Sequence, residues 1–254
     1  MVIGGWVSLL GACLHVDLGQ RNAANASRRT AHELGVHAGC NELTAWAFEI
    51  DAWQTLLDRR YDEAVELCRA GQQLVDPATA VYVQLTAQEA RAWARLKRTR
   101  ETLAAIDRSA VAFAGMPAPA QPDHHFAFDP RKQVGYAATT LAWLGPGGRA
   151  EAYAREAIRS YEAESGRTTS LRRLATARID LAMTVAQQDR PEEACYLGEQ
   201  ALRSGRLLPS NVWRAGELDA ELQSRHRKVA DVRDFHEHYL GVHEAISQGT
   251  AQPL

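Results

Sequence analysis

The sequence is short of lysine and cysteine and has no long apolar run, and each shortage excludes a class of protein. Only three of its 29 basic residues are lysine, and its formal net charge is -2. A chain of this charge has no general attraction for nucleic acid or for an anionic membrane surface. No stretch approaches the roughly 20 apolar residues that a membrane-spanning helix needs. We therefore expect neither direct nucleic-acid binding nor a membrane partner.

The four cysteines form no C-x-x-C pair, which argues against a redox or zinc motif of that kind. Each lies within or beside an apolar helical pattern: Cys13, Cys40, Cys68 and Cys195. Reduced, packed thiols in the cytoplasm are the simplest interpretation. The LGAC sequence at 10–13 resembles a lipoprotein cleavage box. However, no basic residue precedes it and the helical pattern continues through it, so an ordinary first helix is favoured.

Strand-like alternation is also missing, whereas apolar residues recur three or four apart almost everywhere. Short polar turns divide this pattern into helix pairs, one of them around the turn at 58–61. The other pairs are expected at about 3–18 with 21–35, 79–97 with 99–113, 132–144 with 149–165, 170–188 with 191–205, and 211–226 with 229–247. The sequence therefore predicts an all-α protein of about six antiparallel helix pairs.

One segment interrupts the helical pattern. Residues 115–131 hold four of the nine prolines, so helix cannot run through them. We expect N-terminal helical repeats at 1–114, a proline-rich central loop at 115–130, and C-terminal repeats at 131–254. The two repeat regions would form one continuous solenoid, because a single helix pair cannot cover its own apolar face.

Small residues recur where the second helix of each pair would pack closely. They are Ala24, Ala64, Thr102, Ala152 and Ala194, spaced 40, 38, 50 and 42 residues apart. In the fifth pair, Asp189 is expected to cap the second helix and Pro191 to occupy its first turn.

Ala182, Ala194 and Ala201 fall at the spacing of the small positions in a tetratricopeptide repeat, and Gly19, Ala24 and Ala31 repeat part of it. This resemblance implies a right-handed superhelix of helix pairs. More specifically, the chain resembles the C-terminal region of actinobacterial helix-turn-helix regulators of the Xre type. The similar segments are GGWVSLLGACLHVDLGQRNAA, HHFAFDPRKQVGYAATTLAWLG and RPEEACYLGEQAL.

The resemblance implies a ligand-sensing or interaction region of a transcriptional regulator. The DNA-binding domain that precedes the repeats in those proteins has no counterpart in this sequence. The chain is then either part of a longer regulator or a stand-alone relative with a different role. The alternative function is a repeat scaffold recruited as an enzyme in specialised-metabolite biosynthesis, with catalytic residues unknown.

Three tryptophans take positions that line the concave groove in the repeat family: Trp6, Trp46 and Trp53. Four polar residues would join them there: Glu49, Gln84, Arg91 and Arg95. An apolar groove with a few charged groups suits a small molecule or a peptide segment. A protein partner or a second copy is a further possibility. The alternative for the tryptophans is packing in the core.

The central loop contains two adjacent histidines, His124 and His125, followed by Phe126 and Asp129. An imidazole there could act at a pocket mouth as a pH-sensitive donor or general base. In the structural alternative, Phe126 and Phe128 anchor the loop to the core and Asp129 starts the next helix. Both interpretations stay open at this point.

Motifs for nucleotides, nucleophilic serine and metals are missing. There is no G-x-x-x-x-G-K-[ST] and no G-x-S-x-G. His32, His37 and Cys40 have a spacing that no strong zinc motif shares, because glycines suggest that the helix ends between them. We expect no cofactor and no metal site.

Overall fold

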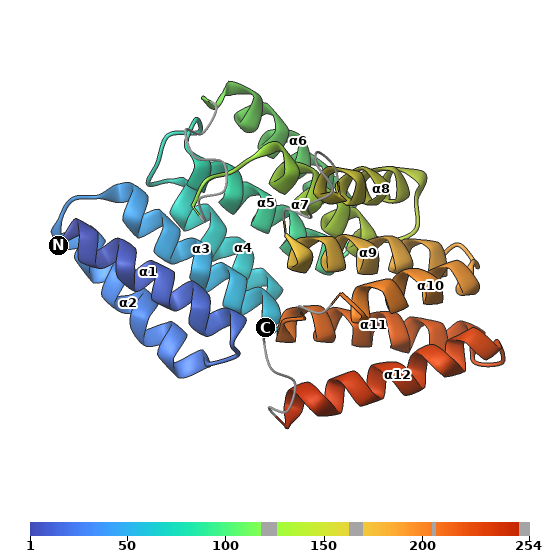
Figure 1. Ribbon diagram of the computed structural model, residues 1–254. Helices are drawn as coiled ribbons and strands as arrows, with labels where there is room; N and C mark the ends of the chain where they lie inside the picture. The colour runs from blue at the N-terminus through green and yellow to red at the C-terminus, as the bar shows by residue number, and fades with distance from the viewer. Residues whose placement is uncertain (118–125, 163–169, 205–206, 249–254) are drawn as a thin grey trace. The chain divides into compact units, whose positions relative to one another are not determined.

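The computed structural model describes residues 1–117, 126–162, 170–204 and 207–248. Within these residues the chain forms twelve α-helices and no strand, so the predicted all-α class is confirmed (Figure 1). The helices are α1 (Val2–Asp17), α2 (Arg21–His37), α3 (Asn41–Leu57), α4 (Tyr61–Gln72), α5 (Ala80–Arg95), α6 (Thr99–Gly115), α7 (Pro130–Leu144), α8 (Gly148–Glu162), α9 (Leu171–Ala186), α10 (Pro191–Leu202), α11 (Pro209–His226) and α12 (Ala230–Ser247). None of the described helices is both long enough and apolar enough to cross a membrane.

Tight turns join the helices within several pairs, and three of these turns place a non-glycine residue in left-handed backbone. Arg59, Lys97 and Asp189 have φ angles of 63°, 58° and 61°. In the first of these turns the N–H of Arg60 donates to the carbonyl of Thr55, five residues back. This Schellman arrangement ends the first helix and lets the second begin at once.

The turn at Asp189 corrects one expectation from the sequence. The N-cap of α10 is Arg190, and no side chain caps that helix. Asp189 instead ends the preceding helix in left-handed backbone, and its carboxylate accepts a hydrogen bond of 2.7 Å from Arg225. Pro191 is the first residue of α10, as predicted.

The chain divides into two compact units, Met1–Tyr136 (unit 1) and Ala137–Leu254 (unit 2), with the boundary inside α7. In unit 1, α2 packs on α3 and α4 packs on α5, while α1, α3 and α5 also contact one another in sequence order. A Cβ on Gly71 would lie 2.8 Å from the end of the Leu85 side chain and 3.0 Å from Cβ of Phe48, so a larger residue would force these neighbours to shift. Leu9, Leu43 and Ile50 are fully buried in the resulting core.

Unit 2 has the same order of contacts. Each of α8, α9, α10 and α11 packs on the next helix, and α9 also contacts α11. A Cβ on Gly198 would lie 2.6 Å from the ring of Phe235, so glycine is required where α10 meets α12. Leu218, Leu222 and Phe235 are fully buried there.

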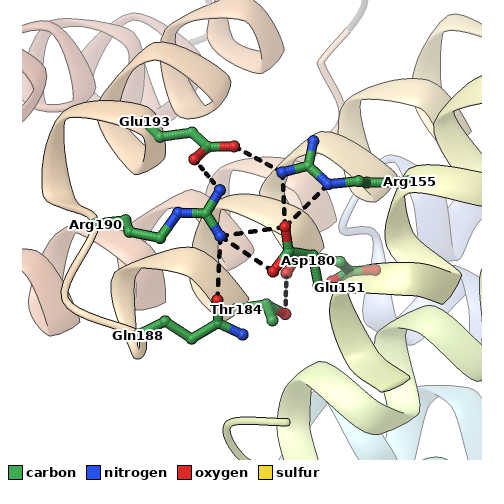
Figure 2. Close-up of polar contacts among 7 residues, drawn as sticks. All are labelled: Glu151, Arg155, Asp180, Thr184, Gln188, Arg190 and Glu193. Carbon is green, nitrogen blue, oxygen red and sulfur yellow. Dashed lines mark hydrogen bonds and ion pairs between the residues drawn. The ribbon is translucent and has the colours of Figure 1, made fainter. Parts of the chain in front are cut away.

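A four-membered ring of alternating charges joins α8 to the start of α10 on the surface of unit 2 (Figure 2). Arg155 bridges Glu151 and Glu193 at 2.7 and 2.8 Å, and Arg190 contacts the same two carboxylates. The hydrogen bond from Arg155 lowers the pKa of Glu151 below its ordinary value, with Arg190 adding to the effect. All four side chains are partly exposed, so water weakens each ion pair, and the ring contributes by aligning α8 with the start of α10.

Candidate functional site

Two of the predicted polar residues meet inside unit 1. Glu49 on α3 and Gln84 on α5 are 4% and 7% exposed, although neither residue type is usually buried. The amide of Gln84 donates a 2.9 Å hydrogen bond to Oε1 of Glu49. Gln88, one turn further along α5, donates a second bond of 3.0 Å to the same oxygen. Two consecutive turns of α5 therefore hold one carboxylate oxygen of α3.

Arg91 and Tyr136 extend this arrangement. Arg91 donates a 2.7 Å hydrogen bond to Oε1 of Gln88, and its guanidinium lies 5.3 Å from the centre of the Tyr136 ring. Gln84 also donates to the hydroxyl of Tyr136, which comes from the first half of α7. We call Glu49, Gln84, Gln88, Arg91 and Tyr136 the inner polar cluster.

Burial dominates the electrostatics of Glu49. Loss of solvent raises the pKa of its carboxyl, and the bonds from Gln84 and Gln88 and the charges of Lys132 and Arg91 only partly oppose this. Burial of the charged carboxylate of Glu49 therefore lowers the free energy of unfolding. Such groups gather at functional sites, although structural networks also produce them.

An aromatic slot lies beside the inner polar cluster on the same core. Phe126, from the segment before α7, packs between Trp6 and Trp46 with ring centroids 5.1 and 5.0 Å away. Phe126 is 6% exposed and Trp46 is 2% exposed, so both are core residues. Trp6 and Trp53 pack against this core but keep partial exposure. The chain itself fills the slot with Phe126.

The buried polar atoms of this region that have no hydrogen-bond partner among the described residues include one donor and one acceptor. They are the indole nitrogen Nε1 of Trp46, which is a donor, and Oε1 of Gln84, which is an acceptor. A buried polar atom without a partner typically costs about 1–3 kcal/mol. Each such atom in a folded protein calls for an explanation, and a ligand or an ordered water is one.

The segment Phe126–Pro130 is firmly attached to α7. Asp129 is 3% exposed, and its carboxylate accepts a 2.8 Å hydrogen bond from the backbone N–H of Lys132 in the first turn. The ammonium of Lys132 donates to the carbonyl of Ala127. Phe128 is fully buried against Phe113 and Tyr136. The structure thus shows the structural alternative, in which Phe126 and Phe128 pack in the core and Asp129 lies at the start of α7.

The remaining predicted residues stand as follows. Arg95 is half-buried one turn after Arg91 on α5, and Trp53 is half-buried two turns after Trp46 on α3. His124 and His125 lie outside the described residues. Ligand binding by any of these positions stays a prediction.

Sequence reasoning missed two members of the inner polar cluster. Gln88 follows Gln84 by four residues and precedes Arg91 by three, so helical spacing alone places all three on one face. The sequence could therefore have predicted that Gln88 lies beside Gln84 and Arg91. Tyr136 carried no comparable signal, because its place depends on how the segment after the proline-rich stretch returns to α5.

A second buried carboxylate in unit 1 differs from Glu49 in its surroundings. Glu89 on α5 is fully buried and accepts hydrogen bonds on both oxygens: Arg69 and Trp93 donate to Oε1, and Gln72 and Arg108 to Oε2. Burial raises its pKa, but these donors outweigh burial and the net pKa is lowered. This saturated carboxylate joins α4, α5 and α6.

Unit 2 contains a buried ion pair that the sequence did not reveal. Asp180 on α9 and Arg214 on α11 are 1% and 4% exposed and form a salt bridge. Thr139 on α7 also donates to Asp180, and the Arg214 guanidinium lies 4.5 Å from the centre of the Trp143 ring. Trp143 is itself buried. Each charge has a partner, so the arrangement favours a structural role.

Two of the four thiols, Cys68 and Cys195, are poor nucleophiles. Burial raises the pKa of Cys68 well above its usual value, with Glu89 and Glu49 adding to the effect, and burial raises that of Cys195 to about 12. Both thiols are therefore protonated at neutral pH. Among the described residues, no three side chains of the metal-binding types gather closely enough to hold an ion.

No protein-family model matches the chain, and no curated protein matches it.

Proposed function

We propose that this chain is a ligand- or partner-binding protein of tetratricopeptide-like repeats, acting as the sensor or interaction part of a bacterial transcriptional regulator. The regulator role rests on the resemblance of its sequence segments. The binding role rests on one observation: an ionisable carboxylate, a buried donor and a buried acceptor without partners, and an aromatic slot share one core in unit 1.

The energetic cost of this arrangement supports a binding role. An array of helix pairs needs only small and apolar residues to bury its core. Glu49 and the two partnerless atoms each reduce stability, and an apolar core would avoid that reduction. Natural proteins keep such local violations mainly at functional sites.

The chemistry of the site favours one kind of ligand. An apolar or aromatic group would replace Phe126 between Trp6 and Trp46. An adjoining amide-like group would accept a hydrogen bond from Nε1 of Trp46 and donate one to Oε1 of Gln84. A small molecule or a peptide with an aromatic side chain fits this description.

Signalling would follow from displacement of Phe126. A ligand that occupies the aromatic slot prefers the state in which Phe126 is outside it, and so shifts the population of that state. Phe126 is joined to α7 through the Asp129 cap, so α7 is the element that would respond. An order change in a short segment is a common form of switch.

Native mass spectrometry of the purified chain, with denaturing extraction of any retained molecule, tests this proposal. We expect a retained molecule that Trp46→Phe loses, since phenylalanine keeps an aromatic ring but removes the N–H. Trp213→Phe, on α11 in unit 2, should keep it and serves as the control.

A second probe covers the case of weak retention. N-acetylphenylalaninamide has the expected ring and amide, and the variant Phe126→Ala opens the slot for it. We expect Phe126→Ala to bind this probe at least ten times more tightly than the unchanged chain, measured by tryptophan fluorescence. No retained molecule and no binding of the probe by either protein would rule out the proposed site.

A further inference from the structure

The outward face of α1 is apolar along its whole length. Ile3, Val7, Leu10 and Leu14 are 81%, 63%, 44% and 63% exposed, and Leu18, just after the helix, is 50% exposed. No exposed position within α1 carries a charged side chain. Large apolar side chains grouped in this way mark interaction surfaces, whereas single exposed ones need no explanation.

The spacing of these residues is that of a helix-pairing seam. Steps of four, three and four residues separate Ile3, Val7, Leu10 and Leu14, which are the steps between the two apolar positions of a heptad. The opposite side of α1 is used already, because Leu9, Ala12 and Cys13 are buried in unit 1. The helix is thus held in place with its seam facing outward, and no described residue covers that seam.

The helix at the other end of the described chain provides a contrast. The exposed positions of α12 include Asp231, Arg233, Asp234, Glu237 and Glu244. Charged side chains of this kind are usual on a helix face that lies in water. The exposed positions of α1 carry none.

We propose that the seam of α1 pairs with the same seam on a second copy of this chain. Pairing of a surface with itself is what a two-fold dimer requires, and a seam without charges suffers no like-charge repulsion. The five side chains expose about 500 Å² per copy, so a dimer would bury about 1,000 Å², the lower limit for a specific interface.

The composition of α1 argues against a lipid surface as the occupant. Helices that lie on membranes combine an apolar face with lysine and arginine. The only acidic or basic side chains of α1 are His15 and Asp17. A helix of the same apolar character is the better complement, and the second copy supplies one.

Sedimentation equilibrium of the 254-residue chain between about 1 and 100 µM tests the proposal. We expect a mass of twice 28.0 kDa. The double variant Val7→Glu/Leu14→Glu should raise the dimer dissociation constant at least 100-fold, because two buried charges per copy would enter an apolar interface. Its far-UV circular dichroism should be unchanged, since both positions are exposed.

Val111→Glu is the matched control, because Val111 is 74% exposed on α6 and lies outside the seam. It should leave the dimer intact. A monomeric unchanged chain over the whole concentration range overturns the proposal, as does a dimer that the double variant leaves intact. A helix supplied by some other partner would give the first of these results.

Cross-linking provides a second measurement. Leu10 lies near the middle of α1, so its counterpart is close in either a parallel or an antiparallel pair. In a Cys40→Ser background, which removes the one partly exposed thiol, oxidised Leu10→Cys should form a disulfide-linked dimer. Val111→Cys should not. Equal cross-linking of the two variants would also overturn the proposal.

Discussion

The two buried glutamates of unit 1 should respond in opposite directions to the same substitution. Glu49 uses only Oε1 to accept its two hydrogen bonds, from Gln84 and Gln88. Glu49→Gln retains a carbonyl oxygen for both bonds and removes a buried charge. The variant should therefore match or exceed the stability of the unchanged chain at pH 7.5.

Glu89 uses both oxygens, with two donors on each. Glu89→Gln places an NH₂ group against two of those donors and weakens the bonds to the other two. A hydrogen bond to a charged group contributes about 1.5–3 kcal/mol when fully buried. Arg69 and Arg108 are 55% and 45% exposed, which weakens their share. We expect a total loss of about 2–3 kcal/mol.

The pH dependence should also differ in sign. The raised pKa of Glu49 means that its protonated form favours folding below the ordinary value of 4.5, and that this contribution is lost as pH rises. The lowered pKa of Glu89 stabilises the fold above its ordinary value of 4.5 and is lost as pH falls. The stability difference of Glu49→Gln should therefore shrink as pH falls from 7.5 towards 4.5, whereas the loss in Glu89→Gln should persist down to about 4.5 and shrink only below it.

Urea unfolding followed by circular dichroism, at pH 7.5 and at pH 5, measures both effects. Comparison of each variant with the unchanged chain at the same pH removes the general effect of acid. A loss above about 1 kcal/mol for Glu49→Gln at pH 7.5 would refute the reasoning, because it exceeds a typical net hydrogen bond. Equal losses for the two variants would refute it as well.

Three further substitutions test other parts of the fold. Phe126→Ala should lower the free energy of unfolding of unit 1 by about 3 kcal/mol, seen as a lower urea midpoint, and should shift the tryptophan emission to the red. Unchanged emission would show that this ring does not fill the slot. Arg214→Leu should lower the free energy of unfolding by about 3–5 kcal/mol, because it leaves Asp180 charged, buried and without its ion pair. The double variant Arg214→Leu/Asp180→Leu should recover most of that stability, and no recovery would contradict this account. Arg59→Gly should raise the unfolding temperature, because glycine adopts the left-handed backbone conformation without the strain of about 1 kcal/mol that other residues bear there. Arg59→Ala should not raise it, and equal unfolding temperatures of the two variants would exclude backbone strain as the cause.

The helices were predictable because their signals are local. Apolar spacing and turn residues are read within a few positions, and α6 ends at Gly115 and α7 begins at Pro130, at the two edges of the proline-rich stretch. Asp189 was misassigned for the same reason. An aspartate two residues before a proline resembles a cap, whereas the Schellman turn of the preceding helix decides its backbone.

The candidate site was predictable only in part. Glu49, Gln84 and Arg91 could be grouped because each lies on a face set by helical spacing. The seating of Phe126 against Trp6 and Trp46 depends on where a loop returns, and no local pattern encodes that. The same holds for partners between 34 and 41 residues apart in unit 2, such as Asp180 with Arg214 and with Thr139.

The contrast between α1 and α12 has a consequence for engineering. A helix pair with an apolar stripe could be grafted ahead of α1 without first changing any surface residue, because the receiving side is apolar already. Extension beyond α12 would require removal of its exposed charges, among them Asp231, Arg233 and Asp234. The apolar surface of α1 could therefore receive an added helix pair as it stands, whereas the surface of α12 would first have to lose charged side chains.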